Sequence, residues 1–95
     1  MRGYEIMLIL PSETEDAAVD GVLERVRAIL AERGGELGAI DKWGRRRLAF
    51  EIERQAEGFY VVAQFTADPE SLREIDRVLS LADDVLRFKV TARAA

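Results

Sequence analysis

The sequence contains no cysteine and no histidine. Without cysteine the chain has no disulfide framework and no thiolate nucleophile, so we expect a reducing compartment, the cytoplasm. Without histidine it lacks the usual general base near neutral pH, and with cysteine also missing it lacks the ligands of ordinary zinc sites. Nucleophilic sites that pair serine or cysteine with histidine are excluded as well. These absences favour a structural or binding role over an enzymatic one.

Long hydrophobic runs are also missing. No apolar stretch approaches the roughly 20 residues that a membrane helix needs, and the first residues lack the pattern of a signal peptide. The 95 residues are 48% hydrophobic and 34% charged, which is the composition of a globular protein. A chain of this length buries roughly two-thirds of its unfolded surface, enough for one core. We therefore expect residues 1–95 to form a single domain.

The first half of the chain predicts a strand, a helix and a second strand. Residues 4–10 form a β-rich run that ends at Pro11, which has no backbone donor for a sheet. We expect Ser12 or Thr14 to cap the helix that follows, and Gly34-Gly35 to end it. Its apolar residues recur at helical spacing: Val19, Val22, Leu23, Val26, Ile29 and Leu30. A long strand is expected over residues 37–52, with a candidate bulge near Gly44.

The second half predicts a hairpin, a helix and a last strand. Residues 54–58 are the expected hairpin connection, and residues 59–66 form the next strand. Asp68 is expected to cap the second helix, because Pro69 suits the first helical turn. The apolar stripe of that helix consists of Leu72, Ile75 and Leu79, and a final strand is expected over residues 85–91.

The predicted order of elements is therefore βαββαβ. This order is typical of the α+β, ferredoxin-like split-βαβ fold, in which a four-stranded antiparallel sheet carries two helices on one face. Right-handed crossovers make this fold the simplest compact solution. Because the fold hosts many functions, the function has to be inferred from its surface.

Charge is distributed unevenly along the chain, whose net charge is −4. The two helical regions are acidic, with −3 over residues 13–33 and −5 over residues 57–84. Two strand regions are basic, with +1 over residues 36–54 and +3 over residues 85–95. The helix side of the fold is thus expected to be negative and part of the sheet positive.

Strand alternation assigns side chains to the two faces of the sheet. Leu48, Phe50 and Ile52 are expected to meet the helices. Arg47 is then expected on the open face, where Trp43 and Arg45 join it if no bulge intervenes. In the last strand, Arg87 and Lys89 are expected to point outward. An apolar patch is expected on the same open face, formed by Met7, Ile9 and Val62.

This apolar patch and residues 43–47 (WGRRR) are the main candidates for binding. Charged groups border the patch, so it is a candidate surface for a partner protein, with ordinary exposed apolar residues as the alternative. Guanidinium groups bind phosphate oxygens in pairs of hydrogen bonds, and Trp43 could stack on an unpaired base or a ribose. Alternatively, the arginines pair with helix carboxylates and Trp43 is a half-buried hairpin residue. Arg2 and Tyr4 are further candidates for RNA contact. The alternatives are that Arg2 lies in a frayed terminus and that Tyr4 is an aromatic residue of the core.

Three motifs are spread along the chain: YEIM at residues 4–7, WGRRRLAFEI at 43–52 and EGFY at 57–60. Together with residues 79–81 and 85–87, they resemble the bacterial small-subunit ribosomal protein S6 family. The resemblance implies a structural component of the small ribosomal subunit, with no enzymatic activity and no cofactor. It also implies binding to the central domain of small-subunit ribosomal RNA, together with ribosomal protein S18.

The resemblance further implies which residues contact RNA, carried over by position: Arg2, Tyr4, Trp43, Arg45, Arg46, Arg47 and Arg87. Because the chain is acidic overall, we expect it to bind RNA weakly alone and well beside a basic protein seated on the open face. The competing hypothesis is an oligomeric ferredoxin-like regulatory or ligand-binding domain. That domain would self-associate through its sheet, whereas the ribosomal interpretation expects a monomer outside the ribosome.

Overall fold

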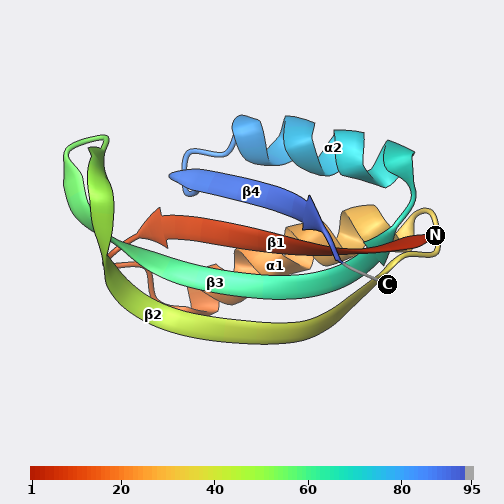
Figure 1. The fold of residues 1–95 in the computed structure, drawn as a ribbon, viewed down its shortest axis with the longest axis horizontal. Helices are drawn as coiled ribbons and strands as arrows, with labels where there is room; N and C mark the ends of the chain where they lie inside the picture. Colours follow the sequence, from red (N-terminus) through yellow and green to blue (C-terminus); the bar gives the residue numbers. More distant parts are fainter. Residues whose placement is uncertain (94–95) are drawn as a thin grey trace.

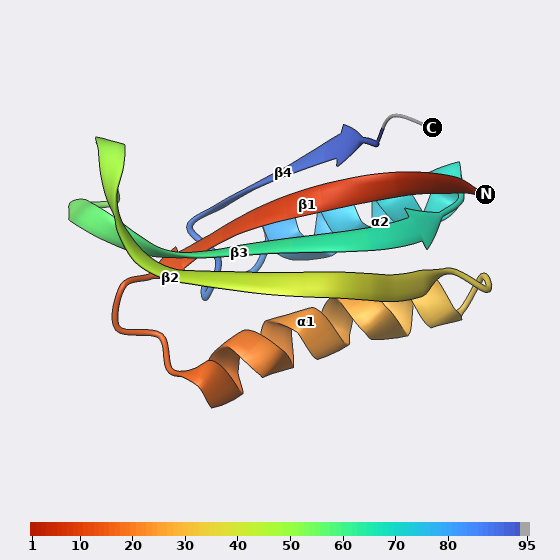
Figure 2. The same ribbon diagram turned by 60° about the horizontal axis from the view of Figure 1, so that its bottom comes forward.

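The computed structural model describes residues 1–93 and contains six elements in the predicted order (Figure 1). The strands are β1 (Arg2–Pro11), β2 (Glu36–Ile52), β3 (Gln55–Ala67) and β4 (Arg87–Ala92), and the helices are α1 (Asp16–Ala31) and α2 (Pro69–Ser80). The strands form one antiparallel sheet in the order β2-β3-β1-β4. Both helices pack on one face of this sheet (Figure 2). The ferredoxin-like α+β fold is confirmed.

The hydrophobic core lies between the sheet and the two helices. Alternate residues of β1 point into it, and Ile6, Leu8 and Leu10 are fully buried. Each helix contributes the apolar stripe predicted from its spacing, led by Val19, Val26 and Leu30 in α1 and by Ile75 and Leu79 in α2. Neither helix among the described residues is long and apolar enough to span a membrane. The core therefore fixes one face of the sheet and leaves the other open.

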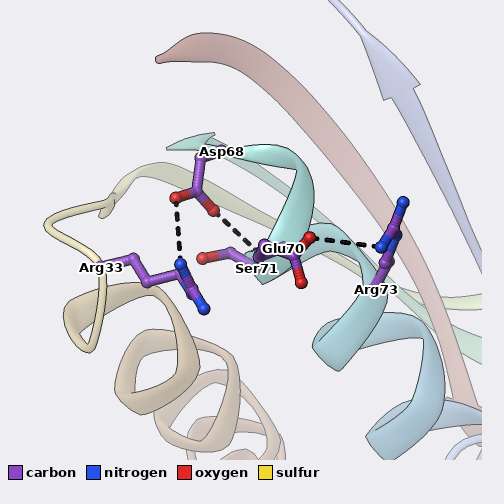
Figure 3. A network of polar contacts seen from close by, with 5 residues as sticks. All are labelled: Arg33, Asp68, Glu70, Ser71 and Arg73. Atoms are coloured by element: carbon purple, nitrogen blue, oxygen red, sulfur yellow. Dashed lines mark hydrogen bonds and ion pairs between the residues drawn. The ribbon is translucent and has the colours of Figure 1, made fainter.

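Helix α2 begins as predicted. An Asp68 carboxylate oxygen accepts a hydrogen bond from the backbone N–H of Ser71 at 3.0 Å, and Pro69 is the first helical residue (Figure 3). This hydrogen bond holds the pKa of Asp68 below its usual value. The other carboxylate oxygen lies 3.9 Å from the Arg33 guanidinium, in the segment after α1. The cap thus joins the end of one helix to the start of the other.

Helix α1 differs from prediction at its start. Glu15 precedes the first helical residue and makes no side-chain capping hydrogen bond. Ser12 and Thr14, the predicted caps, lie in the preceding turn, where the Thr14 N–H donates to the Pro11 carbonyl at 3.0 Å. The end of α1 follows the prediction, because Gly34 adopts a positive φ of 77°.

Strand β2 carries the predicted bulge. Its register against β3 shifts between Lys42 and Gly44, and Gly44 has a φ of 80°. Lys42, before the bulge, points toward α1 and its ammonium lies 2.7 Å from Asp20. Because one extra residue reverses the alternation of a strand, the register places Arg46 on the open face and Arg45 and Arg47 on the opposite side.

The bulge overturns the predicted facing of three residues in the second half of β2. Leu48 was expected to meet the helices, but it lies near Ile9 on the open face, where both side chains approach the Gly58 backbone. Phe50, predicted to face inward as well, is 82% exposed. Arg47, predicted on the open face, is displaced from it by the same one-residue shift.

The hairpin connection also differs from the expected residues 54–58. Strand β3 already begins at Gln55, and the turn consists of Glu53 and Arg54, with φ values of 49° and 66°. Two consecutive positive φ angles are typical of the tight two-residue turn that matches strand twist. The outer end of the β2–β3 hairpin curls away from α1 toward the open face (Figure 2).

Candidate nucleic-acid interface

The cations of the protein divide into two groups by location. Six form ion pairs with carboxylates, and every pair involves a helix or a helix cap: Arg25, Arg27, Arg33, Lys42, Arg73 and Arg77. Within residues 1–93, the other eight have no carboxylate within 4.0 Å: Arg2, Arg45, Arg46, Arg47, Arg54, Arg87, Lys89 and Arg93. The helix-side carboxylates therefore engage the helix cations and Lys42 of β2, whereas the other strand cations have no carboxylate partner among residues 1–93.

The pKa shifts follow the same division. A hydrogen bond from Arg25 holds the pKa of Asp84 below its usual value, and a hydrogen bond from Arg77 does the same for Glu74. A hydrogen bond to Asp20 raises the pKa of Lys42. Each shift favours the charged form of a helix-side group, so these groups already have counter-charges within the protein.

The three consecutive arginines of β2 are all exposed. The alternative that helix carboxylates take up their guanidinium groups does not hold among residues 1–93, where no ion pair involves them. Arg46 lies on the open face, and Arg45 and Arg47 project to the other side of the strand. The run therefore offers donors on both sides of an edge strand of the sheet.

Trp43 packs against a second aromatic ring on the open face, and the residue is 41% exposed. Its ring lies parallel to that of Tyr60, with an interplanar angle of 8° and centroids 6.2 Å apart. Its indole N–H donates to Asp41 at 3.0 Å, and the Arg46 guanidinium lies 5.4 Å from the ring centroid. Sequence reasoning missed Asp41, which lies two residues before Trp43 on the same strand, and Tyr60, which reaches Trp43 from the neighbouring strand β3.

Arg87 lies on the open face at the same level of the sheet. It pairs with Ile9, which pairs with Tyr60, which pairs with Gly44, so one row crosses all four strands. Three strand spacings of about 4.8 Å put Arg87 roughly 14 Å from the bulge. The fold therefore gathers the arginine run, Trp43 and Arg87 at one end of the sheet.

Arg2 and Tyr4 are not part of this group. Arg2 pairs with Ala67 at the far end of β1, nine residues from Pro11, which corresponds to roughly 30 Å along a strand. Tyr4 is only 9% exposed and packs in the core, with its ring 5.6 Å from that of Phe65. The structure thus places Tyr4 as a core aromatic.

The predicted apolar patch is smaller than expected. Met7 and Val62 form a cross-strand pair on the open face and are partly exposed. Ile9 is only 9% exposed, because the hairpin brings Leu48 close to it. A hollow of about 300 Å³ adjoins the patch, and its lining includes Glu5, Asp41, Trp43, Val62 and Gln64.

Comparison with known proteins identifies the relatives of this chain. Residues 3–92 match the family model described as Ribosomal protein S6. The chain belongs to the ribosomal protein S6 family. Small ribosomal subunit protein bS6 of Desulforamulus reducens is 42% identical over 90 residues, covering 95% of both chains. The bS6 protein of Nocardia farcinica is 46% identical over 90 residues, again covering 95% of both.

A solved structure agrees with this membership. The 30S ribosomal protein S6 from Thermotoga maritima superimposes with a TM-score of 0.84 at 29% sequence identity, covering 97% of this chain and 87% of that one. The resemblance of the YEIM, WGRRRLAFEI and EGFY motifs to the S6 family is therefore confirmed. Membership makes this chain a ribosomal protein of the small subunit.

Proposed function

We propose that this S6-family chain acts in the cytoplasm as a non-catalytic component of the small ribosomal subunit and binds small-subunit ribosomal RNA. Residues 1–95 act as one domain in this role. The observation that carries the proposal is the division of the cations. The helix-side cations are engaged by the protein's own carboxylates, whereas Arg45, Arg46, Arg47 and Arg87 have no such partner among residues 1–93.

The RNA backbone follows the edge strand β2 at the curled end of the hairpin. Such a path brings phosphates within reach of Arg46 on one side of the strand and of Arg45 and Arg47 on the other. Arg87 supports the same RNA from the far edge of the open face. Arg2 makes a separate contact about 30 Å away, since nine residue steps separate the two ends of β1. Tyr4 is left out of this surface, because its ring packs in the core.

Ribosomal protein S18 covers the open face beside the RNA in this proposal. An acidic chain gains little long-range attraction to RNA, so a basic neighbour supplies the missing charge. Met7 and Val62 provide an apolar contact, with Ile9 packed beneath the hairpin.

Binding to a fragment of 16S ribosomal RNA that contains the central domain tests this proposal. The R45A/R46A/R47A variant is compared with R27A/R73A/R77A, which removes the same charge from helix arginines that pair with carboxylates three residues away. Each phosphate contact contributes about 0.7 to 0.9 to the slope of log affinity against log salt. The slope is therefore expected to fall by about 2 to 3 for the first variant and to stay near wild type for the second.

The same titration with and without purified S18 tests the partner. Weak binding alone and tight binding with S18 are expected. Tight solitary binding at physiological salt would refute the role of the partner, and equal salt slopes for the two triple variants would move the RNA contact elsewhere. Sedimentation of the protein without RNA is expected to show a monomer, whereas a stable dimer would favour the ligand-binding alternative.

A further inference from the structure

Asp41 is an acidic side chain beside the proposed RNA surface, where its charge alone opposes phosphate binding. Its carboxylate nevertheless accepts a hydrogen bond from the indole N–H of Trp43 at 3.0 Å. We infer that Asp41 is a positioning residue, which holds the Trp43 ring as a platform for the Arg46 guanidinium. This inference rests on the proposed RNA binding and adds a residue to it.

The contacts form a continuous series. Asp41 and Trp43 lie on either side of Lys42, directly before the bulge at Gly44. The hydrogen bond fixes one edge of the indole, and the parallel ring of Tyr60 on β3 fixes its plane. A tryptophan that is 41% exposed would otherwise sample several rotamers. Two independent contacts therefore give this ring one orientation on the open face.

The fixed ring in turn restrains Arg46. Its guanidinium carbon lies 5.4 Å from the centroid of the indole, within the range of about 6 Å for a cation–π contact. A guanidinium attracted by an aromatic ring keeps its N–H groups available, and among residues 1–93 no carboxylate occupies them. Restraint before binding lowers the entropy that the arginine loses when it meets a phosphate.

A positioning role of Asp41 predicts that the D41A variant binds RNA more weakly, although the loss of a negative charge alone would strengthen binding. Removing one negative charge near bound RNA ordinarily strengthens binding. D41A also removes the hydrogen-bond acceptor, so the loss of the platform is expected to weaken RNA binding about two- to fivefold, the factor for an exposed cation–π contact. D41N removes the charge but keeps an amide oxygen that accepts from the indole. It is therefore expected to bind at least as tightly as wild type.

Glu5 provides the matched control. It lines the same hollow as Asp41 and makes no hydrogen bond to Trp43. E5A removes one negative charge from the open face without releasing the indole, so its RNA affinity is expected to equal or exceed that of wild type. A weakening seen in D41A but absent in both D41N and E5A thus separates positioning from charge.

Trp43 is the only tryptophan, so its fluorescence gives a second readout that does not depend on RNA. Acrylamide quenching and the near-UV circular dichroism of the indole are expected to change in D41A and to be restored in D41N. RNA affinity is measured with the 16S fragment and S18. If D41A matches E5A in affinity, or leaves the indole signals unchanged, the inference is wrong. If the wild-type protein does not bind the RNA, the proposed function is wrong. Independently of RNA, unchanged quenching and circular dichroism of the indole in D41A would overturn the positioning role of Asp41.

Discussion

Replacing Gly58 with alanine tests how the β2–β3 hairpin closes over the open face. A Cβ at this position would lie 2.6 Å from Ile9 Cγ2 and 3.3 Å from Leu48 Cδ2. Ile9 Cγ2 is a methyl group on the branched Cβ of a nearly buried side chain, so it has little room to move. Glycine is required here by the close approach of two strands.

The expected loss is that of an overpacked interior, about 1 to 3 kcal/mol. For a domain of this size, 1 kcal/mol shifts the melting temperature by roughly 4 to 8 °C, so G58A is expected to melt about 4 to 24 °C lower. Thermal unfolding followed by far-UV circular dichroism measures this shift. G21A is the control, because a Cβ there meets nothing within 4 Å and the exposed site lies inside α1. Its stability is expected to rise by about 0.5 to 1 kcal/mol.

A double variant identifies the clash. I9A removes the methyl that a Cβ at Gly58 would strike, so G58A should cost less in an I9A background than in wild type. Side chains in direct contact typically show couplings of about 0.5 to 3 kcal/mol. If G58A melts at the wild-type temperature, or if the two losses simply add, the proposed closure of the hairpin over Ile9 is wrong.

Three further predictions concern pH, the hairpin and the bulge. The folded-state pKa values of Asp68 and Asp84 lie below their ordinary values, so their stabilisation is complete above a pH of about 4 and is lost as the pH falls through the folded-state values. Urea unfolding across acidic pH should show this decline, and a smaller decline in D84N; equal declines would argue against the ion pair. F50S should change stability by less than about 0.5 kcal/mol, because that ring is exposed, whereas L48A should cost about 2 kcal/mol or more. Equal losses for these two variants would contradict the orientation of the hairpin. G44A should cost about 1 to 2 kcal/mol although its surroundings are open, since the positive φ alone disfavours alanine; a stable G44A would show that the bulge tolerates another conformation.

The order of elements was predictable because its signals are local. The Asp68-Pro69 start of α2 depends on neighbouring residues alone, and the structure shows the same cap. The arginine run and Trp43 were also found as candidates from a short stretch of sequence. Local composition specifies such features regardless of what packs against them.

The sheet face on which each side chain after the bulge lies was not predictable in the same way. A strand pattern does not indicate whether a glycine such as Gly44 adds a residue to the register, and one residue decides the face of everything after it. The turn at Glu53 and Arg54 carries none of the Asn-Gly signals of its type. Residues 54–58, which include Gly58, were therefore the expected connection. Tyr60 was missed for a related reason, because its ring reaches Trp43 across strands. The hydrogen bond from Trp43 to Asp41 lies within β2, and no sequence motif signals it.

The internal pairing of the helix-side cations has a consequence for the approach to a polyanion. The carboxylates left over on that layer repel it, while the strand guanidinium groups attract it, so the field of nearby RNA exerts a torque on the whole molecule. Within a Debye length, about 8 Å at physiological salt, the domain is turned with its helices outward before the first contact forms. A domain with one negative and one positive side approaches a polyanion in one preferred orientation. Added salt should weaken this preference as well as the binding affinity.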